Sequence, residues 1–223
     1  FRMIRYGYEN KIDEASAILK SLPEKYDYQF DGDPFIGNIK DCNDCDHQAE
    51  QLFVYNRSTL FGNMSSLKQK IKRKEEVYSN ALKLANAFYN MSFFGNARVY
   101  YQGIIGSNGA YYQYYDAEYI PDYLKELLLG TEMSEYYYEL ALKHAGNNEQ
   151  KAKCWYMLAK CERNDFYITN YYMFEEGDEK TSTNTDFIAW AGFKELKTKF
   201  SGTKFYHDVI GECGYFSTYI KGH

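Results

Sequence analysis

The sequence predicts an all-α fold of stacked antiparallel helical hairpins, and three observations support this prediction. Apolar residues recur at positions i, i+3, i+4 and i+7 over most of the 223 residues, and no segment shows a convincing strand-like alternation. The breaks between the apolar stripes are short, so consecutive helices are expected to run antiparallel. Only 3 prolines interrupt the chain, which permits long helices.

Six apolar stripes define the expected helices. In chain order they lie at residues 12–22, 77–91, 137–144, 152–162, 189–200 and 206–213. Pro23 directly follows the first stripe and closes it, because proline cannot continue a helix. Ser201 or Thr203 is expected to cap the last helix, since a hydroxyl oxygen accepts a hydrogen bond from an unpaired N–H of the first turn.

The chain is expected to form one α-helical repeat domain over residues 1–223. Its opening letters, FRMIRYGY, resemble the middle of a protein, so we expect the C-terminal part of a longer chain. Irregular inserts are expected near residues 26–45, 103–121 and 175–185, where glycine, proline or acidic and threonine-rich letters replace the helical pattern.

The charge of the chain narrows the classes of partner. A formal net charge of −5 disfavours nucleic acid, whose binders usually carry a basic excess. No run of about 18 apolar residues occurs, so no transmembrane helix is expected. One basic run contains Lys68, Lys70, Lys72, Arg73 and Lys74. Two glutamates follow it directly, so the pattern favours a solvated helix end over an anion site.

The stretch NIKDCNDCDHQAEQ, residues 38–51, is the only local cluster with the letters of a chemical site. Covalent haem attachment requires a histidine directly after the second cysteine, and here Asp46 intervenes. A thioredoxin-like pair requires an α/β context, which the surroundings lack. Cys42 and Cys45 have the spacing of two zinc ligands and His47 supplies a third, but a fourth ligand is missing locally.

The interpretation favoured over zinc is an acidic turn that caps a helix beginning near Asp46. Cys42 and Cys45 are then buried apolar residues, or a disulfide if the protein is exported. The other three cysteines, Cys154, Cys161 and Cys213, lie on helical stripes and are expected in the core. The scattered histidines form no nucleophile motif, so we expect no enzyme and no resident cofactor.

A tyrosine-rich segment, residues 103–121, is the second candidate site. Its central tyrosines are Tyr111, Tyr112, Tyr114 and Tyr115. The connection is longer than the expected hairpins need, and such connections are often binding loops. Tyrosine stacks on sugar rings and anchors peptides, but it also packs well between helices, and the second role is favoured.

Residues 81–101, ALKLANAFYNMSFFGNARVYY, resemble a tetratricopeptide repeat. Leu84 and Ala85 stand where the repeat has Leu-Gly, and Phe88 stands at its aromatic position. Ala97 and Tyr101 stand at the alanine and the aromatic of the second helix. The resemblance implies an α-α superhelix, in which small residues let paired helices approach closely.

Further irregular copies extend the resemblance over roughly half of the chain. One begins at Trp155 and has Glu162 where an aromatic residue is expected, and another begins at Phe193. The segment FSGTKFYHDVI, residues 200–210, is similar to the turn and second helix of that last copy. The stretches DPF, IKDCNDCDH and FYNMSFFGNARVYY also resemble cell-envelope proteins of Bacteroidetes-type bacteria, which implies an exported location.

The function predicted from these patterns is a non-catalytic interaction scaffold of the cell envelope. Its partner is expected to be a protein, a peptide or the rest of a longer parent chain, held on a helical-repeat surface. One alternative is a glycan-binding module of an exported uptake system, suggested by the 25 tyrosines. The other alternative is a metal-binding protein that uses Cys42, Cys45 and His47.

Overall fold

The computed structural model describes residues 1–30, 32–37, 53–101, 122–168 and 190–222. These residues are mostly helical and contain no β-strand, which confirms the all-α class. None of their helices is both long and apolar enough to cross a membrane. The elements are α1 (Arg2–Tyr8), α2 (Ile12–Ser21), η1 (Glu24–Tyr26), α3 (Arg57–Lys72), α4 (Val77–Met91), η3 (Arg98–Tyr101), α6 (Asp122–Leu129), α7 (Glu132–Lys143), α8 (Asn148–Tyr167), α9 (Ala191–Lys199), α10 (Lys204–Glu212) and α11 (Gly214–Lys221).

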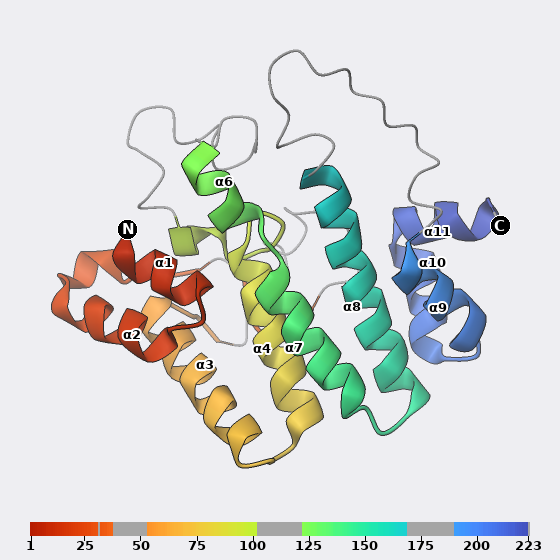
Figure 1. The fold of residues 1–223 in the computed structure, drawn as a ribbon, viewed down its shortest axis with the longest axis horizontal. Coiled ribbons are helices and arrows are strands. Elements are labelled where there is room, and N and C mark those ends of the chain that lie inside the picture. Colours follow the sequence, from red (N-terminus) through yellow and green to blue (C-terminus); the bar gives the residue numbers. More distant parts are fainter. Residues whose placement is uncertain (31, 38–52, 102–121, 169–189, 223) are drawn as a thin grey trace.

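The helices form a row in which each packs mainly against the next (Figure 1). From the N-terminal end the order is α1, α2, α3, α4, α7, α8 and α9, and the extensive contact between α4 and α7 joins the two halves. At the other end α10 packs on α8, and α11 packs on α9 and α10. The described residues between 26 and 37 contain no α-helix, and the rest of the insert expected near residues 26–45 lies outside the described residues.

Side-chain caps start several of these helices. Asn56 and Thr59 form a reciprocal capping box at the start of α3, with N···O distances of 2.9 and 2.8 Å. Thr203 caps α10 as predicted, because its hydroxyl accepts from the backbone N–H of Tyr206 at 3.1 Å. The helix expected at residues 206–213 corresponds to α10, which ends at Glu212, and Cys213 then caps the start of α11.

Helix α4 lies at the centre of the core, between α3 and α7. It is buried almost throughout, so its amide side chains need partners inside the protein. Asn86 donates to the carbonyl of Phe35 at 2.9 Å. Asn90 donates to the carbonyls of Pro34 and Ile36 at 3.0 and 2.8 Å. The two asparagines therefore hold a non-helical segment against the central helix.

Arg57, the first residue of α3, is buried and forms hydrogen bonds that connect separate segments of the N-terminal half. Its guanidinium donates to the carbonyls of Tyr26, Val99 and Tyr100 at 2.7, 3.2 and 3.0 Å. It also lies 4.5 Å from the ring centroid of Tyr28. The burial lowers the pKa of Arg57, and carbonyl oxygens with an aromatic face replace the lost water.

Two glutamates on α8 attach the C-terminal helices. Glu149 accepts from the backbone N–H groups of Lys204 and Phe205 at 2.7 and 3.0 Å, at the start of α10. Glu162 accepts from the backbone N–H of Gly192 at 2.9 Å, near the start of α9. A carboxylate is favourable there because the first N–H groups of a helix are unpaired and its N-terminus is positive. This contact gives Glu162 a structural role of its own, at a position where the resemblance predicts an aromatic residue.

Two of the segments that resemble a repeat can be followed in the described residues. Residues 200–210 contain the C-cap of α9, a turn and most of α10. Within residues 81–101, α4 is followed by a turn and the short 3₁₀ helix η3, and Ala97 lies directly before η3. Helix α4 packs against α3 and α7.

A glycine substitution tests the close contact between α8 and α9. A Cβ at Gly192 would lie 2.7 Å from the Cβ of Ala159 and 2.8 Å from the carbonyl oxygen of Trp155. Backbone atoms cannot yield easily, so we expect Gly192→Ala to lower the free energy of unfolding by about 1–3 kcal/mol. Gly62 lies within α3 with nothing near its Cβ position, so Gly62→Ala is the matched control and is expected to stabilise by about 0.5–1 kcal/mol. Urea unfolding measures both changes, and equal values for the two variants would contradict the prediction.

Candidate functional site

An open cavity of about 440 Å³ lies between α2, α3 and α7, and we call it the α2–α3–α7 groove. Its volume lies within the range of small-molecule binding pockets, which is about 300–1,000 Å³. Figure 1 shows the order of these helices, with α4 between α3 and α7. The lining residues of the groove are Asp13, Ser65, Lys68, Gln69, Ile71, Lys72, Tyr136, Tyr137 and Leu140.

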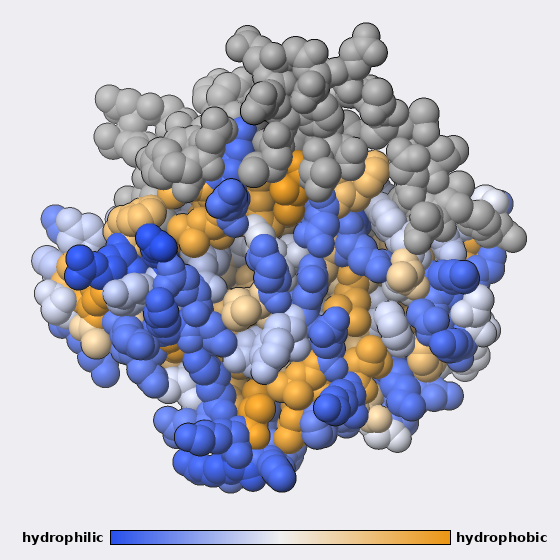
Figure 2. Space-filling model, in the orientation of Figure 1, coloured by the Kyte–Doolittle hydropathy of each residue, from blue (hydrophilic) through white to orange (hydrophobic). Residues whose placement is uncertain are grey.

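One wall of the groove is cationic and belongs to the last turns of α3. Lys68 and Lys72 are four residues apart and therefore lie on the same face of the helix. Lys72 is exposed, whereas Lys68 is half-buried. Burial lowers the pKa of Lys68, and the charge of Asp13 partly opposes this effect. In Figure 2, hydrophilic side chains cover α3 and the α3–α4 turn, and hydrophobic ones show between them and α8.

The opposite wall is aromatic and belongs to α7. Tyr136 is 55% exposed, which leaves much of its ring free to contact a ligand. Tyr137 is buried and lies edge-on to Tyr136, with ring centroids 4.9 Å apart. Behind it, Phe88 of α4 stacks on Tyr137 with a centroid distance of 5.6 Å. The exposed ring therefore rests on a packed aromatic layer.

Asn10, in the turn between α1 and α2, connects the two walls. Its backbone carbonyl accepts from the Lys68 ammonium at 2.7 Å. Its side-chain amide donates to the Tyr137 hydroxyl at 2.9 Å. The residue has a φ of 59°, in the left-handed region that asparagine tolerates better than most residues. The conformation of this turn therefore places one cation and one aromatic residue of the groove.

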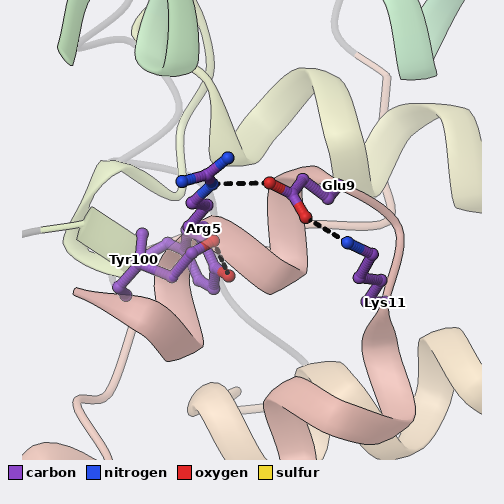
Figure 3. Close-up of polar contacts among 5 residues, drawn as sticks. Arg5, Glu9, Lys11 and Tyr100 are labelled. Carbon is purple, nitrogen blue, oxygen red and sulfur yellow. Dashed lines mark hydrogen bonds and ion pairs between the residues drawn. The ribbon is translucent and has the colours of Figure 1, made fainter. Parts of the chain in front are cut away.

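Figure 3 shows polar contacts next to this turn, namely two ion pairs of Glu9 and a hydrogen bond from Tyr100 to α1. The Glu9 carboxylate lies between Arg5 and Lys11, with N···O distances of 2.6 Å to each. The two cations lower the pKa of Glu9, but exposed ion pairs contribute little to stability. The buried Tyr100 hydroxyl anchors α1 more firmly, by donating to the carbonyl of Ile4 at 3.0 Å.

A second cluster, of carboxyl groups, joins the start of α7 to the end of α8. The Thr131 hydroxyl oxygen lies 2.7 Å from Glu135 Oε1 and 3.0 Å from Asp165 Oδ1. A hydroxyl has one hydrogen to donate, so a second hydrogen bond here requires a proton on a carboxyl group. Burial and the neighbouring Glu135 raise the pKa of Asp165 to about 7. The cluster therefore retains a proton over part of the neutral range.

The residues predicted as sites lie outside the described residues. This holds for the proposed metal ligands Cys42, Cys45 and His47, and for the tyrosines Tyr111, Tyr112, Tyr114 and Tyr115. Both sites stay predictions. Within the described ranges no three histidine, cysteine or acidic side chains gather in a way that could hold a metal ion.

Other predictions about single residues are confirmed. Cys154 and Cys161 are buried thiols in α8, and burial raises the pKa of both. Cys213 is buried as well. His144 is the C-cap residue of α7.

Only some of the groove residues could be identified from the sequence, and none of them as part of a site. The basic run contains Lys68 and Lys72, but it was interpreted as a solvated helix end. Tyr136 belongs to the run YYY at residues 136–138, whose members have different exposures: Tyr136 is exposed, and Tyr137 and Tyr138 are buried. The helical period alone identifies Tyr137 as a core residue and leaves Tyr136 beside it, which is the available signal.

Comparison of the chain with family models, with curated proteins and with solved structures found no match. The geometry of the described residues is therefore the basis for proposing a function.

The raised pKa of Asp165 makes the stability of the protein depend on pH. A carboxyl whose pKa is raised in the folded state binds its proton more tightly there, so its contribution to stability falls as pH rises from about 4 to about 7. We expect Asp165→Asn, which stays neutral, to flatten the pH dependence of the free energy of unfolding over this window. Urea titrations at several pH values measure the effect.

The groups near this pair include Glu132, Cys161, Lys160 and Arg163, and they remain in the variant. Asp208→Asn, at an exposed carboxyl on α10, is the matched control and is expected to retain the slope of the unchanged protein. Parallel curves for the unchanged protein and Asp165→Asn would contradict a raised pKa of Asp165.

Proposed function

We propose that the protein is a non-catalytic interaction module that binds an extended peptide segment of a partner protein in the α2–α3–α7 groove. The observation that supports this proposal best is the pairing, across one open cavity, of the exposed Tyr136 with Lys68 and Lys72. Aromatic residues supply large contact areas at binding surfaces, and polar groups around them orient the ligand.

Some side chains of the groove are already held in place by contacts within the protein, and others are accessible to a ligand. Tyr137 is held by Phe88 and Asn10, and Lys68 is held by Asn10, so these groups lose little freedom when a ligand binds. Preorganisation of this kind improves affinity, because the ordering cost is met during folding. Tyr136 and Lys72 remain accessible for contact with the ligand.

The row of helices suits a scaffold of this type. Repeat-like helical arrays expose long surfaces on which loops and helix faces from distant parts of the chain meet. Here α2, α3 and α7 contribute to one groove although they are far apart in sequence. We extend the proposal to the whole arrangement, as a tetratricopeptide-like superhelix that presents this surface.

Selection from a phage-displayed library of random linear peptides tests the function. We expect the protein to enrich peptides whose affinity falls about tenfold or more in Tyr136→Ala, because truncation of an aromatic anchor commonly costs about 2 kcal/mol or more. Amide chemical shifts of the groove residues Ser65, Gln69 and Leu140 are expected to change when a selected peptide is added. Fluorescence anisotropy measures the affinities.

Tyr26→Ala is the matched control, because Tyr26 is also a partly exposed tyrosine but lies outside the groove. Its backbone carbonyl, which accepts from Arg57, is retained in the variant. Selected peptides that bind Tyr136→Ala as well as the unchanged protein would place the binding surface elsewhere. Failure to enrich any peptide would contradict the proposed function.

A further inference from the structure

We infer that the ligand of the α2–α3–α7 groove is an acidic peptide, with a carboxylate bound by Lys68 and Lys72 and a neighbouring apolar side chain packed on Tyr136. This inference rests on the proposed function and specifies its ligand class. The groove side chains, their existing contacts and their charges support it in three steps.

The first observation is that the groove has two lysine ammonium groups without a carboxylate partner among the described residues. Neither Lys68 nor Lys72 forms an ion pair with any described residue, although both face the same cavity. A position near the C-terminal end of α3 favours cations in general, and it accounts for the exposed Lys70. It does not account for Lys68, whose half-burial disfavours its charged form.

The second step concerns the hydrogen-bonding capacity that remains in the groove. The Lys68 ammonium uses one N–H on the carbonyl of Asn10, and an ammonium has three N–H donors. Asp13 is the one acidic lining residue, and its Oδ1 already accepts from the Ser65 hydroxyl at 2.7 Å. Two cations and one carboxylate leave the lining with a net charge of +1. The lining is thus locally positive on a chain of net charge −5, and Glu14 of α2 is a further carboxylate whose charge acts on Lys68.

The third step distinguishes a peptide from a small anion. The acidic chain as a whole repels anions, so a bound anion requires short-range contacts in addition to charge. A cavity of about 440 Å³ is larger than one carboxylate or phosphate group needs, and Ile71, Tyr136 and Leu140 provide apolar surface beside the lysines. A peptide satisfies both requirements, because its carboxylate and its neighbouring apolar side chain bind together.

Two synthetic peptide pools of equal length test the ligand class. One pool contains random positions of glutamate and large apolar residues, and the other contains glutamine at every glutamate position. We expect the acidic pool to bind about five- to tenfold more tightly at low ionic strength, with the difference shrinking as sodium chloride is added. Fluorescence anisotropy of the labelled pools measures both affinities.

Variants assign the preference to the groove. Lys72→Gln changes an exposed side chain, and it is expected to remove most of the preference for glutamate. Asn10→Gly keeps a backbone conformation that glycine adopts readily and retains the carbonyl that accepts from Lys68, but it removes the hydrogen bond to the Tyr137 hydroxyl, so it is expected to weaken both pools. Lys194→Gln, at an exposed position of α9, is the control and is expected to retain the preference.

The outcomes separate this inference from the proposed function. Equal binding of both pools in the groove would overturn the acidic ligand and leave peptide binding intact. Failure of both pools together with the random library would overturn the proposed function itself. A glutamate preference that survives Lys72→Gln and Lys68→Gln, or displacement of the acidic pool by inorganic phosphate at equal affinity, would also overturn the inference.

Discussion

The near-complete burial of α4 is the constraint on which the rest of the structure depends. A helix that is buried on several sides must find partners for its polar side chains inside the protein, because water cannot reach them. Asn86 and Asn90 meet this requirement by binding the segment at residues 33–37. Asn86 also accepts from the Tyr138 hydroxyl of α7 at 2.8 Å, and Tyr89 accepts from Asn164 of α8 at 3.0 Å. The central helix therefore positions a non-helical segment and two neighbouring helices.

The groove follows from this central position. Helices α3 and α7 both pack on α4, and the cavity is lined by residues of α2, α3 and α7. Phe88 of α4 supports the aromatic wall from below, and Asn10 connects that wall to Lys68. The proposed binding surface is thus rigid in its inner layer, whereas Tyr136 and Lys72 extend from it into solvent.

The carboxylates of α8 and the neighbouring α7 differ in chemistry because their partners differ. Glu149 and Glu162 accept from backbone N–H groups at helix starts, which stabilise a negative charge. Asp165 lies beside Glu135 and the Thr131 hydroxyl, and its raised pKa lets it retain a proton near neutrality. Glu149 and Glu162 therefore attach the C-terminal helices, whereas Asp165 makes the α7–α8 contact sensitive to pH.

The sequence by itself determined the helical class, most of the long helices and a hydroxyl cap at Ser201 or Thr203, because helical period and capping are local properties. Helix α3 carries the same apolar spacing, whereas α1 and α6, with 7 and 8 residues, are too short to show two full turns of a pattern. The choice of Thr203 as the cap was decided by the structure, and the role of Glu162 depends on which helix lies opposite, which no local pattern contains.

The groove could not be predicted for the same reason. Asp13, Lys68 and Tyr136 meet only because α2, α3 and α7 pack in a particular order around α4. The sequence identified Lys68 and Lys72 as a basic run, but their common orientation toward an aromatic wall is a property of packing. The local amino-acid sequence decides which segments become helices. Contacts between residues far apart in the chain decide which side chains form a site.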